Sequence, residues 1–412
     1  MHSNINIKYP EVLSPAGDFE RLIAAVEFGA DAVYLGSDIF GMRATPKNFS
    51  ADELIKATEY AHSRGVKVYL TCNTTPHYDE IDKFPDFIKH AYESGVDAAI
   101  VSDIGVLSLT KKYAPDMEIH ISTQAGIVNH VTANELYNMG AKRVVLAREL
   151  SLMEIANIRS RIPSDLDIEV FVHGSMCVSF SGRCLLSNYM INRDANRGEC
   201  AQPCRWGYHL VEEKRPNEHY PIYEDERGTY ILNAKDLCMI EHIDKLVDAG
   251  VSSFKIEGRA KSFYYVSTIT NAYRCATDHF LTSKDTPLPS WIIEETKKVS
   301  HRQYSTGFFF GHTKNSEYYE NSGYVRDYDI VGVVDSSDGN YIYITQRNKF
   351  YVGDEVEVLS PKKEPVTMRI DKLIDCEGNE LDSAPHAEMK LKIPSSRLFE
   401  KYSIIRRKAT TK

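Results

Sequence analysis

The 412-residue sequence predicts an α/β protein: a (β/α)8 barrel of the TIM type that carries a cysteine-bearing insertion, followed by a small all-β barrel domain. Three observations predict this architecture. Short apolar runs alternate with amphipathic helical stretches eight times before about residue 280, and eight such steps close a barrel. The runs are almost continuously hydrophobic, as in parallel strands that are covered on both faces. After about residue 325, short β-rich runs are separated by tight turns.

The first step is EVLSPA at 11–16, followed by FERLIAAVEFGA, whose apolar residues recur at helical spacing. The second strand, AVYLG at 32–36, precedes a helix that Ser50 and Glu53 open as a capping box. The remaining strands are predicted at 67–73, 98–103, 118–124, 142–147, 168–174 and 252–258. Several helices end in glycine just before the next strand, a frequent C-cap. An open doubly wound sheet is the rival fold, but no G-x-G-x-x-G motif follows the first strand.

One interval breaks this spacing. About eighty residues separate the seventh strand from the eighth, against about thirty for the usual step. The predicted organisation is therefore a barrel at 1–282 with a cysteine-rich insertion at about 175–250, a helical and aromatic connector at 283–324, and an all-β domain at 325–412. Because the insertion starts at the C-terminal end of a barrel strand, it lies where barrel enzymes build their active sites.

The composition indicates a globular protein of the cytoplasm. The apolar runs are too short to span a bilayer, and the N-terminal residues lack the pattern of a secretory signal. The net charge of −9 does not favour nucleic-acid binding, although arginines gather in the insertion at Arg183, Arg193, Arg197 and Arg205. A second basic cluster, Arg406, Arg407 and Lys408, is interpreted as a solvated face. In a reducing compartment, clustered cysteines are ligands or catalysts rather than disulfides.

Half of the eight cysteines lie in the opening segment of the insertion, at Cys177, Cys184, Cys200 and Cys204. Zinc sites usually pair cysteines as C-x2-C, which is absent here, so zinc is the weaker alternative. An iron–sulfur cluster accepts looser spacing when loops fold around it. Reactive or inert thiols are the remaining alternatives. Cys72, Cys275 and Cys376 are predicted to be buried core residues. The same interpretation suits the four cysteines of the insertion poorly, because they lie in a polar loop.

Two further interpretations compete for these residues. Cys238, in NAKDLCMIEHI, is a rival fourth ligand, although its position on a helical apolar stripe favours a core residue. His173 and Cys177 are four residues apart and could form a nucleophilic pair, but no orienting group is identifiable. No G-x-S-x-G and no H-E-x-x-H motif occurs in the chain, so a peptidase would lack a recognisable catalytic motif.

Polar residues at the C-terminal ends of the strands are expected to line the mouth of the barrel. The candidates are Arg43, Asn73, Asp103, Gln124, Arg148, Glu149, His173, Glu257 and Arg259. For each arginine, an ion pair with a neighbouring acid at the barrel rim is the alternative interpretation. His173 is either a proton shuttle or a hydrogen-bonded histidine at the end of a strand.

The central segment EVFVHGSMCVSFSGRCLLS, at 169–187, resembles the signature of the collagenase-like peptidases, peptidase family U32. The resemblance continues through NRDANRGECAQPCRW at 192–206, YEDERGTYILNAKDL at 223–237 and FKIEGRAKSFYYV at 254–266. It also includes LSPAGD near the start and GADAVYLG at 29–36, and therefore covers nearly the whole chain. These motifs are most similar to the branch associated with 5-hydroxyuridine at the wobble position of tRNA.

The resemblance implies an iron–sulfur enzyme that hydroxylates RNA rather than a proven peptidase. It assigns a [4Fe–4S] cluster to Cys177, Cys184, Cys200 and Cys204, and the fourth ligand is the one for which Cys238 competes. It implies prephenate as co-substrate, the anticodon region of tRNA as substrate, and a homologous partner protein. A collagenase-like peptidase and a non-catalytic cluster protein of a modification complex remain the alternatives.

The implied substrates give the mouth residues specific roles. Prephenate carries two carboxylates, and arginine forks bind carboxylates in a bidentate manner, so Arg43, Arg148 and Arg259 are the candidate anchors. Asn73 and Gln124 are candidates for contacting substrate, and His173 and Glu257 for proton transfer. Phosphates would meet the arginines of the insertion. Flipped bases would stack on Tyr189, Trp206 or Tyr208, although these aromatic residues have an alternative role as a cover for the cluster.

Overall fold

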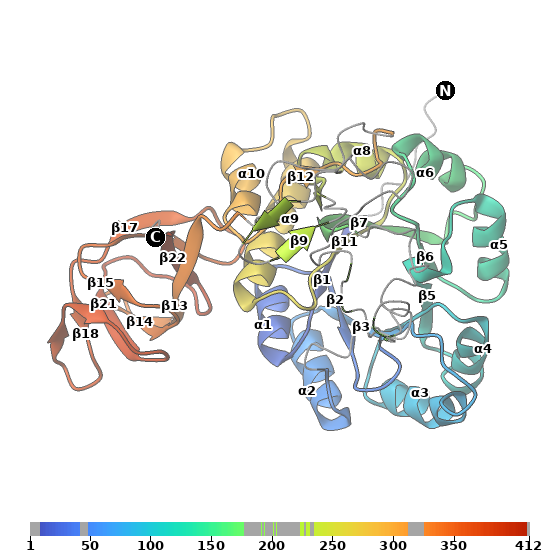
Figure 1. Ribbon diagram of the computed structural model, residues 1–412, viewed down its shortest axis with the longest axis horizontal. Helices are drawn as coiled ribbons and strands as arrows, with labels where there is room; N and C mark the ends of the chain where they lie inside the picture. Colours follow the sequence, from blue (N-terminus) through green and yellow to red (C-terminus); the bar gives the residue numbers. More distant parts are fainter. Residues whose placement is uncertain are drawn as a thin grey trace, which may run out of the picture. The chain divides into compact units, whose positions relative to one another are not determined.

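The computed structural model describes residues 9–41, 48–176, 235–311 and 325–409, together with residues 191, 193, 201, 203, 223–225 and 228–230. They belong to two compact units (Figure 1). The first unit comprises Met1–Val26, Ala30–Lys261 and Arg302–Tyr324. The second comprises Glu27–Gly29, Ser262–His301 and Val325–Lys412.

The first unit contains a closed barrel of eight parallel strands. These are β1 (Glu11–Pro15), β2 (Ala32–Gly36), β3 (Lys67–Cys72), β4 (Ala98–Val101), β5 (Glu118–Ile121), β6 (Arg143–Val145), β7 (Asp167–Ser175) and β11 (Ser253–Ile256). They follow one another around the ring in chain order, and β11 closes it by pairing with both β7 and β1. All eight predicted strands are present, so the barrel is confirmed and the open sheet was the wrong alternative.

Helices connect the strands and lie outside the ring (Figure 1). They are α1 (Phe19–Glu27), α2 (Ala51–His62), α3 (Phe84–Glu93), α4 (Ile104–Tyr113), α5 (His130–Asn138), α6 (Leu152–Arg159) and α8 (Ile243–Asp248). The predicted capping box is present, because the Ser50 amide donates to the Glu53 carboxylate at 3.0 Å and the Ser50 hydroxyl accepts from the Glu53 amide. Gly65 and Gly95 follow α2 and α3 with φ of 72° and 83°, a backbone conformation that favours glycine.

A charged layer fills the N-terminal end of the barrel interior. The Arg143 guanidinium reaches Glu11 at 2.5 Å and Glu169 at 3.1 Å, and Lys255 Nζ lies 2.7 Å from Glu169 Oε1. The Tyr69 hydroxyl donates to Glu11 at 2.7 Å. These side chains come from five different strands, so the layer ties opposite sides of the ring together. The sequence did not predict this layer, because a single charged residue in or beside an apolar run gives no sign of the charges that it will meet from other strands.

The charges of this layer compensate one another. Burial opposes ionisation of Glu169, but Lys255 and Arg143 outweigh that effect and hold its pKa below the usual range. For Glu11, burial is likewise outweighed by Arg143, and its pKa is also lowered. His120 packs edge-on against the Tyr69 ring, and burial followed by the nearby Arg143 charge lowers its pKa. His120 is therefore neutral at pH 7, while both carboxylates are ionised.

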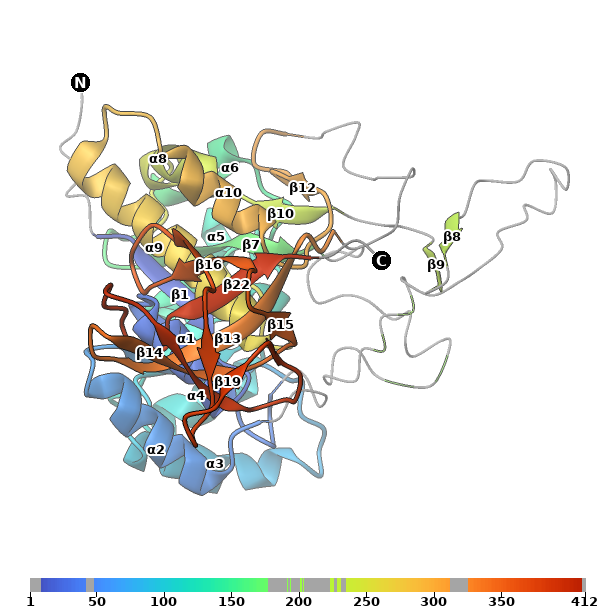
Figure 2. The ribbon, with the colours of Figure 1, turned by 90° about the vertical axis from the view of Figure 1, so that its left-hand side faces the viewer.

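Two short strands extend the barrel sheet beyond β7. β10 (Asp236–Cys238) pairs with β7 in antiparallel orientation, with Cys238 opposite His173, and β12 (Tyr304–Ser305) pairs with β10 in parallel. Figure 2 shows the three strands side by side. The helical stripe predicted for Cys238 is wrong, because the 3-10 turn η5 (Ile240–His242) and α8 begin only after it. Backbone pairing with β7 overrides the local periodicity there. β8 (Tyr223–Asp225) and β9 (Gly228–Tyr230) pair with each other.

The second unit contains α9 (Phe263–Ser283), α10 (Ser290–Lys297) and an antiparallel sheet. The sheet has the order β17-β16-β22-β13-β14-β21-β18-β19, and β15 (Phe350–Tyr351) pairs separately with β20 (Ser383–Ala384). Its strands are β13 (Tyr328–Ser337), β14 (Tyr341–Gln346), β16 (Glu355–Leu359), β17 (Val366–Arg369), β18 (Leu373–Ile374), β19 (Glu380–Leu381), β21 (Lys390–Pro394) and β22 (Ile404–Lys408). The predicted all-β domain is thereby confirmed.

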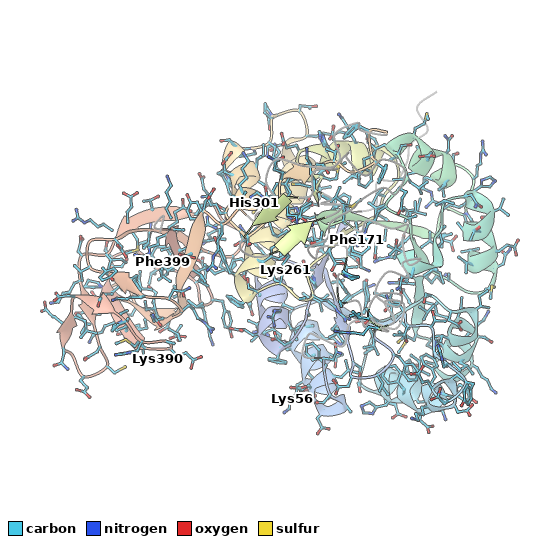
Figure 3. All side chains as sticks on the ribbon, in the orientation of Figure 1. Lys56, Phe171, Lys261, His301, Lys390 and Phe399 are labelled. Atoms are coloured by element: carbon cyan, nitrogen blue, oxygen red, sulfur yellow. The ribbon has the colours of Figure 1, made fainter. Side chains whose placement is uncertain are left out.

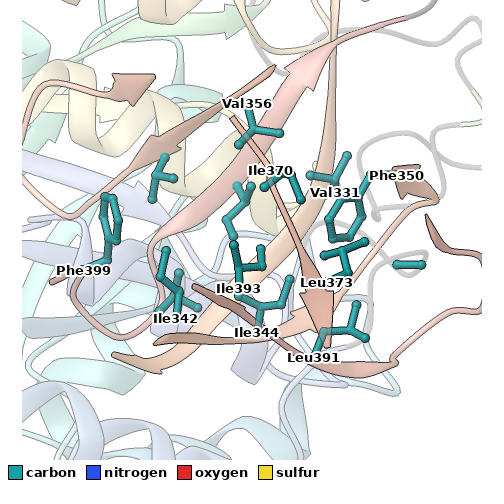
Figure 4. Packing of buried hydrophobic residues seen from close by; sticks show 14 residues of the cluster. Val331, Ile342, Ile344, Phe350, Val356, Ile370, Leu373, Leu391, Ile393 and Phe399 are labelled. Carbon is teal, nitrogen blue, oxygen red and sulfur yellow. The ribbon is translucent and has the colours of Figure 1, made fainter. Parts of the chain in front are cut away.

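One face of this sheet packs into a hydrophobic core (Figure 4). On β14, Ile342 and Ile344 are buried and Tyr343 between them is exposed, as strand alternation requires. The interpretation of Arg406 as a solvated residue is wrong, because its side chain is fully buried. It donates to Glu295 at 2.8 Å and to Glu357 at 3.0 Å, so its charge is compensated inside the unit. In the described part of the chain, none of the helices has the length and apolarity needed to cross a membrane.

Candidate functional site

The C-terminal end of β7 places His173 at the mouth of the barrel. His173 is 1% exposed, and its Nε2 lies 3.4 Å from the Tyr304 hydroxyl, with ring centroids 5.2 Å apart. Tyr304 comes from β12, 131 residues further along the chain. Sequence reasoning missed Tyr304, since the connector prediction for 283–324 contained no signal that the chain returns to β7. The structure thus places His173 beside a phenol that can donate to or accept from its ring nitrogen.

Arg148 and Glu257 lie beside each other on the rim next to His173. The Arg148 guanidinium is 3.5 Å from the Glu257 carboxylate and donates to the Ser175 carbonyl at 2.8 Å. It also stacks 3.8 Å above the ring of Phe171, which Figure 3 labels inside the ring of helices. The Glu257 amide donates to the His173 carbonyl at 2.9 Å. The alternative interpretation of a rim ion pair is therefore observed for Arg148.

Arg259 enters the mouth from the loop after β11. Its side chain is 4% exposed, and Nη1 donates to the Thr71 hydroxyl at 2.7 Å. A Cβ atom on Gly36, the last residue of β2, would lie 2.4 Å from the same Nη1. A side chain at this position would therefore displace the guanidinium. The structure brings Arg259 to the mouth as predicted, whereas Arg43 lies outside the described residues.

The ends of β3, β4 and β5 carry uncharged polar side chains. Asn73 Nδ2 donates to the Ser122 hydroxyl at 3.3 Å, and the Ser102 hydroxyl donates to the Asn73 carbonyl at 3.0 Å. The backbone N–H of Gln124 also donates to the Ser122 hydroxyl, at 3.3 Å. Asn73 and Gln124 are thus joined through one serine, which their separation of about fifty residues did not predict. Asp103 instead caps α4 by accepting from the Val106 amide at 3.0 Å.

The comparisons with known proteins identify the chain. The model of peptidase family U32 matches residues 17–318, and the model of the U32 C-terminal domain matches residues 326–406. The chain belongs to peptidase family U32. The resemblance seen in its motifs is therefore confirmed, and the match to the C-terminal domain coincides with the antiparallel sheet of the second unit.

Several relatives are similar along most of this U32 chain. The tRNA hydroxylation protein P1 of Bacillus subtilis is 38% identical over 384 residues, which cover 92% of this chain and 90% of that protein. The tRNA hydroxylation protein P of Escherichia coli is 36% identical over 418 residues, with 91% of both chains covered. A collagenase of Porphyromonas gingivalis is 32% identical over 385 residues and covers 90% of this chain and 91% of its own.

The four cysteines predicted as cluster ligands, Cys177, Cys184, Cys200 and Cys204, lie outside the described residues, so their role stays a prediction. The rival ligand Cys238 is described, half-buried on β10 and opposite His173. Within the ranges that the structure describes, no group of three His, Cys, Asp or Glu residues is placed to hold a metal ion. What the described residues contribute is the position of β7, which ends at the mouth with Ser175, two residues before Cys177.

The other cysteines of this U32 chain differ in their surroundings. Cys72 is buried as expected, and burial raises the pKa of its thiol, so it is unreactive. Cys275 is half-buried, and burial raises its pKa to about 12. The core prediction for Cys376 is wrong, because this residue is exposed beside a turn that contains Gly378. Polar turn residues at 375–379 place it at the surface.

Proposed function

We propose that this U32 protein is a tRNA-modifying enzyme that hydroxylates the wobble uridine to 5-hydroxyuridine, with prephenate as co-substrate. The observation that carries the proposal is the match to two proteins named for tRNA hydroxylation over about nine-tenths of each chain. Both units are included in these matches, so the proposal concerns the whole chain rather than a shared barrel.

The mouth residues support a substrate that carries carboxylates. Arg259 is held between Thr71 and Gly36 with little exposure, and such a fixed guanidinium is suited to a carboxylate. Arg148 would be a second anchor by exchanging its long 3.5 Å contact with Glu257 for a substrate carboxylate. We assign proton transfer to His173 and Glu257, which lie next to each other across β7 and β11.

The proposal includes a [4Fe–4S] cluster bound by Cys177, Cys184, Cys200 and Cys204, with Cys238 as the rival fourth ligand. When bound, such a cluster supplies electrons or a Lewis-acidic iron at the mouth. Cys238 is compatible with a place near it, since its strand borders the end of β7. The arginines of the insertion would meet tRNA phosphates, and a homologous U32 protein is the proposed partner.

The decisive test is nucleoside analysis of tRNA from a strain that lacks this gene and any paralogue. We expect 5-hydroxyuridine derivatives to disappear and to return with the wild-type gene. The Cys200→Ala variant should fail to restore them and should purify anaerobically without absorbance near 400 nm. Cys376→Ala, which changes an exposed cysteine of the second unit, should restore both. Unchanged nucleosides in the deletion strain would remove this function.

The collagenase relative supports a second candidate, a peptidase. Gelatin cleavage by purified protein, measured before and after removal of iron, distinguishes the candidates. Cleavage that survives iron removal and is lost in His173→Ala would favour the peptidase. Retained iron–sulfur absorbance without any catalytic activity would favour the third alternative, a non-catalytic member of a modification complex.

A further inference from the structure

The mouth of the barrel has two chemically different sides. Charged residues lie at the ends of β6, β7 and β11, where Arg148, His173 and Glu257 are found. The Arg259 guanidinium reaches from the loop after β11 to Thr71 on β3. Uncharged donors and acceptors occupy the ends of β3, β4 and β5, where Asn73, Ser102, Ser122 and Gln124 lie. β4 is the fourth strand from β11 in either direction around the ring, so the two groups face each other across the opening. We call the second group the amide side.

Gln124 leaves an unsatisfied acceptor on the amide side. Its Oε1 is buried, and it has no hydrogen-bond partner among the residues that the structure describes. Its backbone is held firmly, because η2 (Thr123–Ala125) is anchored by Ser122 and by the Thr123 hydroxyl, which donates to the Leu146 carbonyl at 3.1 Å. A buried carbonyl oxygen without a partner costs free energy that a ligand's N–H group can recover.

The amide side is chemically suited to an uncharged ligand edge. The side-chain amide of glutamine or asparagine carries an acceptor oxygen beside donor N–H groups, and Asn73 lies on the same side of the mouth, where its Nδ2 donates to Ser122. Carboxylates and phosphates present only acceptors, so they would leave Gln124 Oε1 unpaired. A pyrimidine imide presents an N–H group between two carbonyl oxygens, which matches the alternation of acceptor and donor.

We propose that the amide side binds the imide edge of a uracil base, with Gln124 Oε1 accepting the hydrogen bond from N3–H. This inference rests on the proposed function and specifies which part of the mouth holds which part of the substrate. Asn73, fixed through Ser122, donates to a uracil carbonyl. Enzymes that modify a base commonly read its Watson–Crick edge in this way after flipping it out of its stack.

This orientation also places the reactive edge of the base. In a uracil ring, the C5–C6 edge lies on the opposite side from N3. A base held by the amide side therefore directs C5 across the mouth, toward β7 and β11. That side carries His173 and Glu257, the groups assigned to proton transfer.

The test compares two synthetic anticodon stem-loop RNAs that carry uridine or 3-methyluridine at the wobble position, because the methyl group removes the N3–H donor. Binding to the full-length protein, purified anaerobically, is measured by fluorescence titration. Wild-type protein should bind the uridine RNA about tenfold more tightly, which corresponds to one hydrogen bond to a buried group.

Gln124→Ala and Gln124→Leu should bind both RNAs within about twofold. Gln303→Ala removes an exposed glutamine of the same unit and should keep the wild-type preference.

The outcomes separate this inference from the function on which it rests. Equal affinities of the wild-type protein for the two RNAs, or an unchanged preference in both folded Gln124 variants, would overturn the inference and leave tRNA hydroxylation standing. Thermal melting establishes that the variants are folded, and Gln124→Leu retains the volume that Gln124→Ala removes. Failure of the wild-type protein to bind either RNA would overturn the proposed function and the inference together.

Discussion

The two ends of the barrel use polar residues in opposite ways. At the N-terminal end, Arg143 and Lys255 meet Glu11 and Glu169 in a closed, charge-balanced layer. Two nitrogen atoms of this layer, His120 Nδ1 and Arg143 Nε, have no hydrogen-bond partner among the described residues. At the mouth, the Arg148 guanidinium lies 3.5 Å from the Glu257 carboxylate, and Gln124 Oε1 has no hydrogen-bond partner among the described residues.

The difference separates stability from function. Buried charges that satisfy one another hold a ring together but have nothing left with which to bind a ligand. A long ion-pair contact and an unpaired acceptor lower the stability of the free protein, and a bound substrate can offset this loss by supplying the missing partner. Barrel enzymes place such groups at the C-terminal face. Both ends leave some polar atoms without partners among the described residues, so incomplete hydrogen bonds indicate a functional site only at the C-terminal face, where the strand ends converge.

The largest expected effect follows from breaking the charged layer. Glu169→Ala leaves Lys255 and Arg143 facing each other without the carboxylate between them. We expect the free energy of unfolding to fall by about 3–5 kcal/mol, as for other buried ion pairs that lose one partner. Urea denaturation measures this value.

The matched control is Lys142→Ala, which removes an exposed ion pair with Asp165 in the same unit. Its effect should stay within about 0.5 kcal/mol. A similar loss in the two variants would contradict the distinction drawn here between the buried layer and the surface.

A smaller effect, confined to activity, is expected at the mouth. Tyr304→Phe keeps the ring that packs on His173 but removes the hydroxyl 3.4 Å from its Nε2. We expect kcat for tRNA hydroxylation to fall about tenfold with unchanged KM, because the tyrosine orients His173 rather than binding substrate. The melting temperature should not change.

Tyr341→Phe removes a tyrosine hydroxyl from the second unit and provides the control. If Tyr304→Phe lowered the melting temperature and the activity in parallel, Tyr304 would be a structural residue.

The smallest effect concerns pH. Burial lowers the pKa of His120 below its ordinary value of 6.5, so the unfolded chain takes up this proton more readily than the folded protein does. The contribution of neutral His120 to the free energy of unfolding should therefore be fully present above pH 6.5. It should be lost as the pH falls from 6.5 toward the pKa of His120 in the folded protein. His120→Gln should flatten the melting temperature across this window. Equal slopes in the wild-type protein and in His120→Gln would exclude His120 as the cause.

Much of the fold could be predicted because its signals are local. The runs at 32–36 and 67–73 are apolar enough to require cover on both faces, and Ser50 with Glu53 marks a helix start within four residues. The same local reasoning failed at Cys238, where the apolar periodicity of the following helix was extended too far. It also failed at Arg406, because a basic cluster in sequence does not show whether acids from elsewhere will meet it.

The candidate site was predictable to the extent that strand ends converge. Asn73, Gln124, Arg148, His173, Glu257 and Arg259 all lie at the mouth, because every parallel strand ends on the same side. Their partners could not be predicted. The contact of Arg259 with Thr71 joins residues 188 positions apart, and nothing near either residue in the sequence refers to the other.

The sequence alone predicts eight strand–helix units, a U32 signature and a separate β-rich region, because each of these depends on spacing within a few tens of residues. Tertiary structure alone decided that Tyr304 meets His173, that Lys255 neutralises Glu169, and that Gln124 Oε1 finds no partner among the described residues. The physical reason is that closing the ring brings distant strands within hydrogen-bonding reach. Which polar groups then find partners depends on register and side-chain reach, which no local pattern encodes.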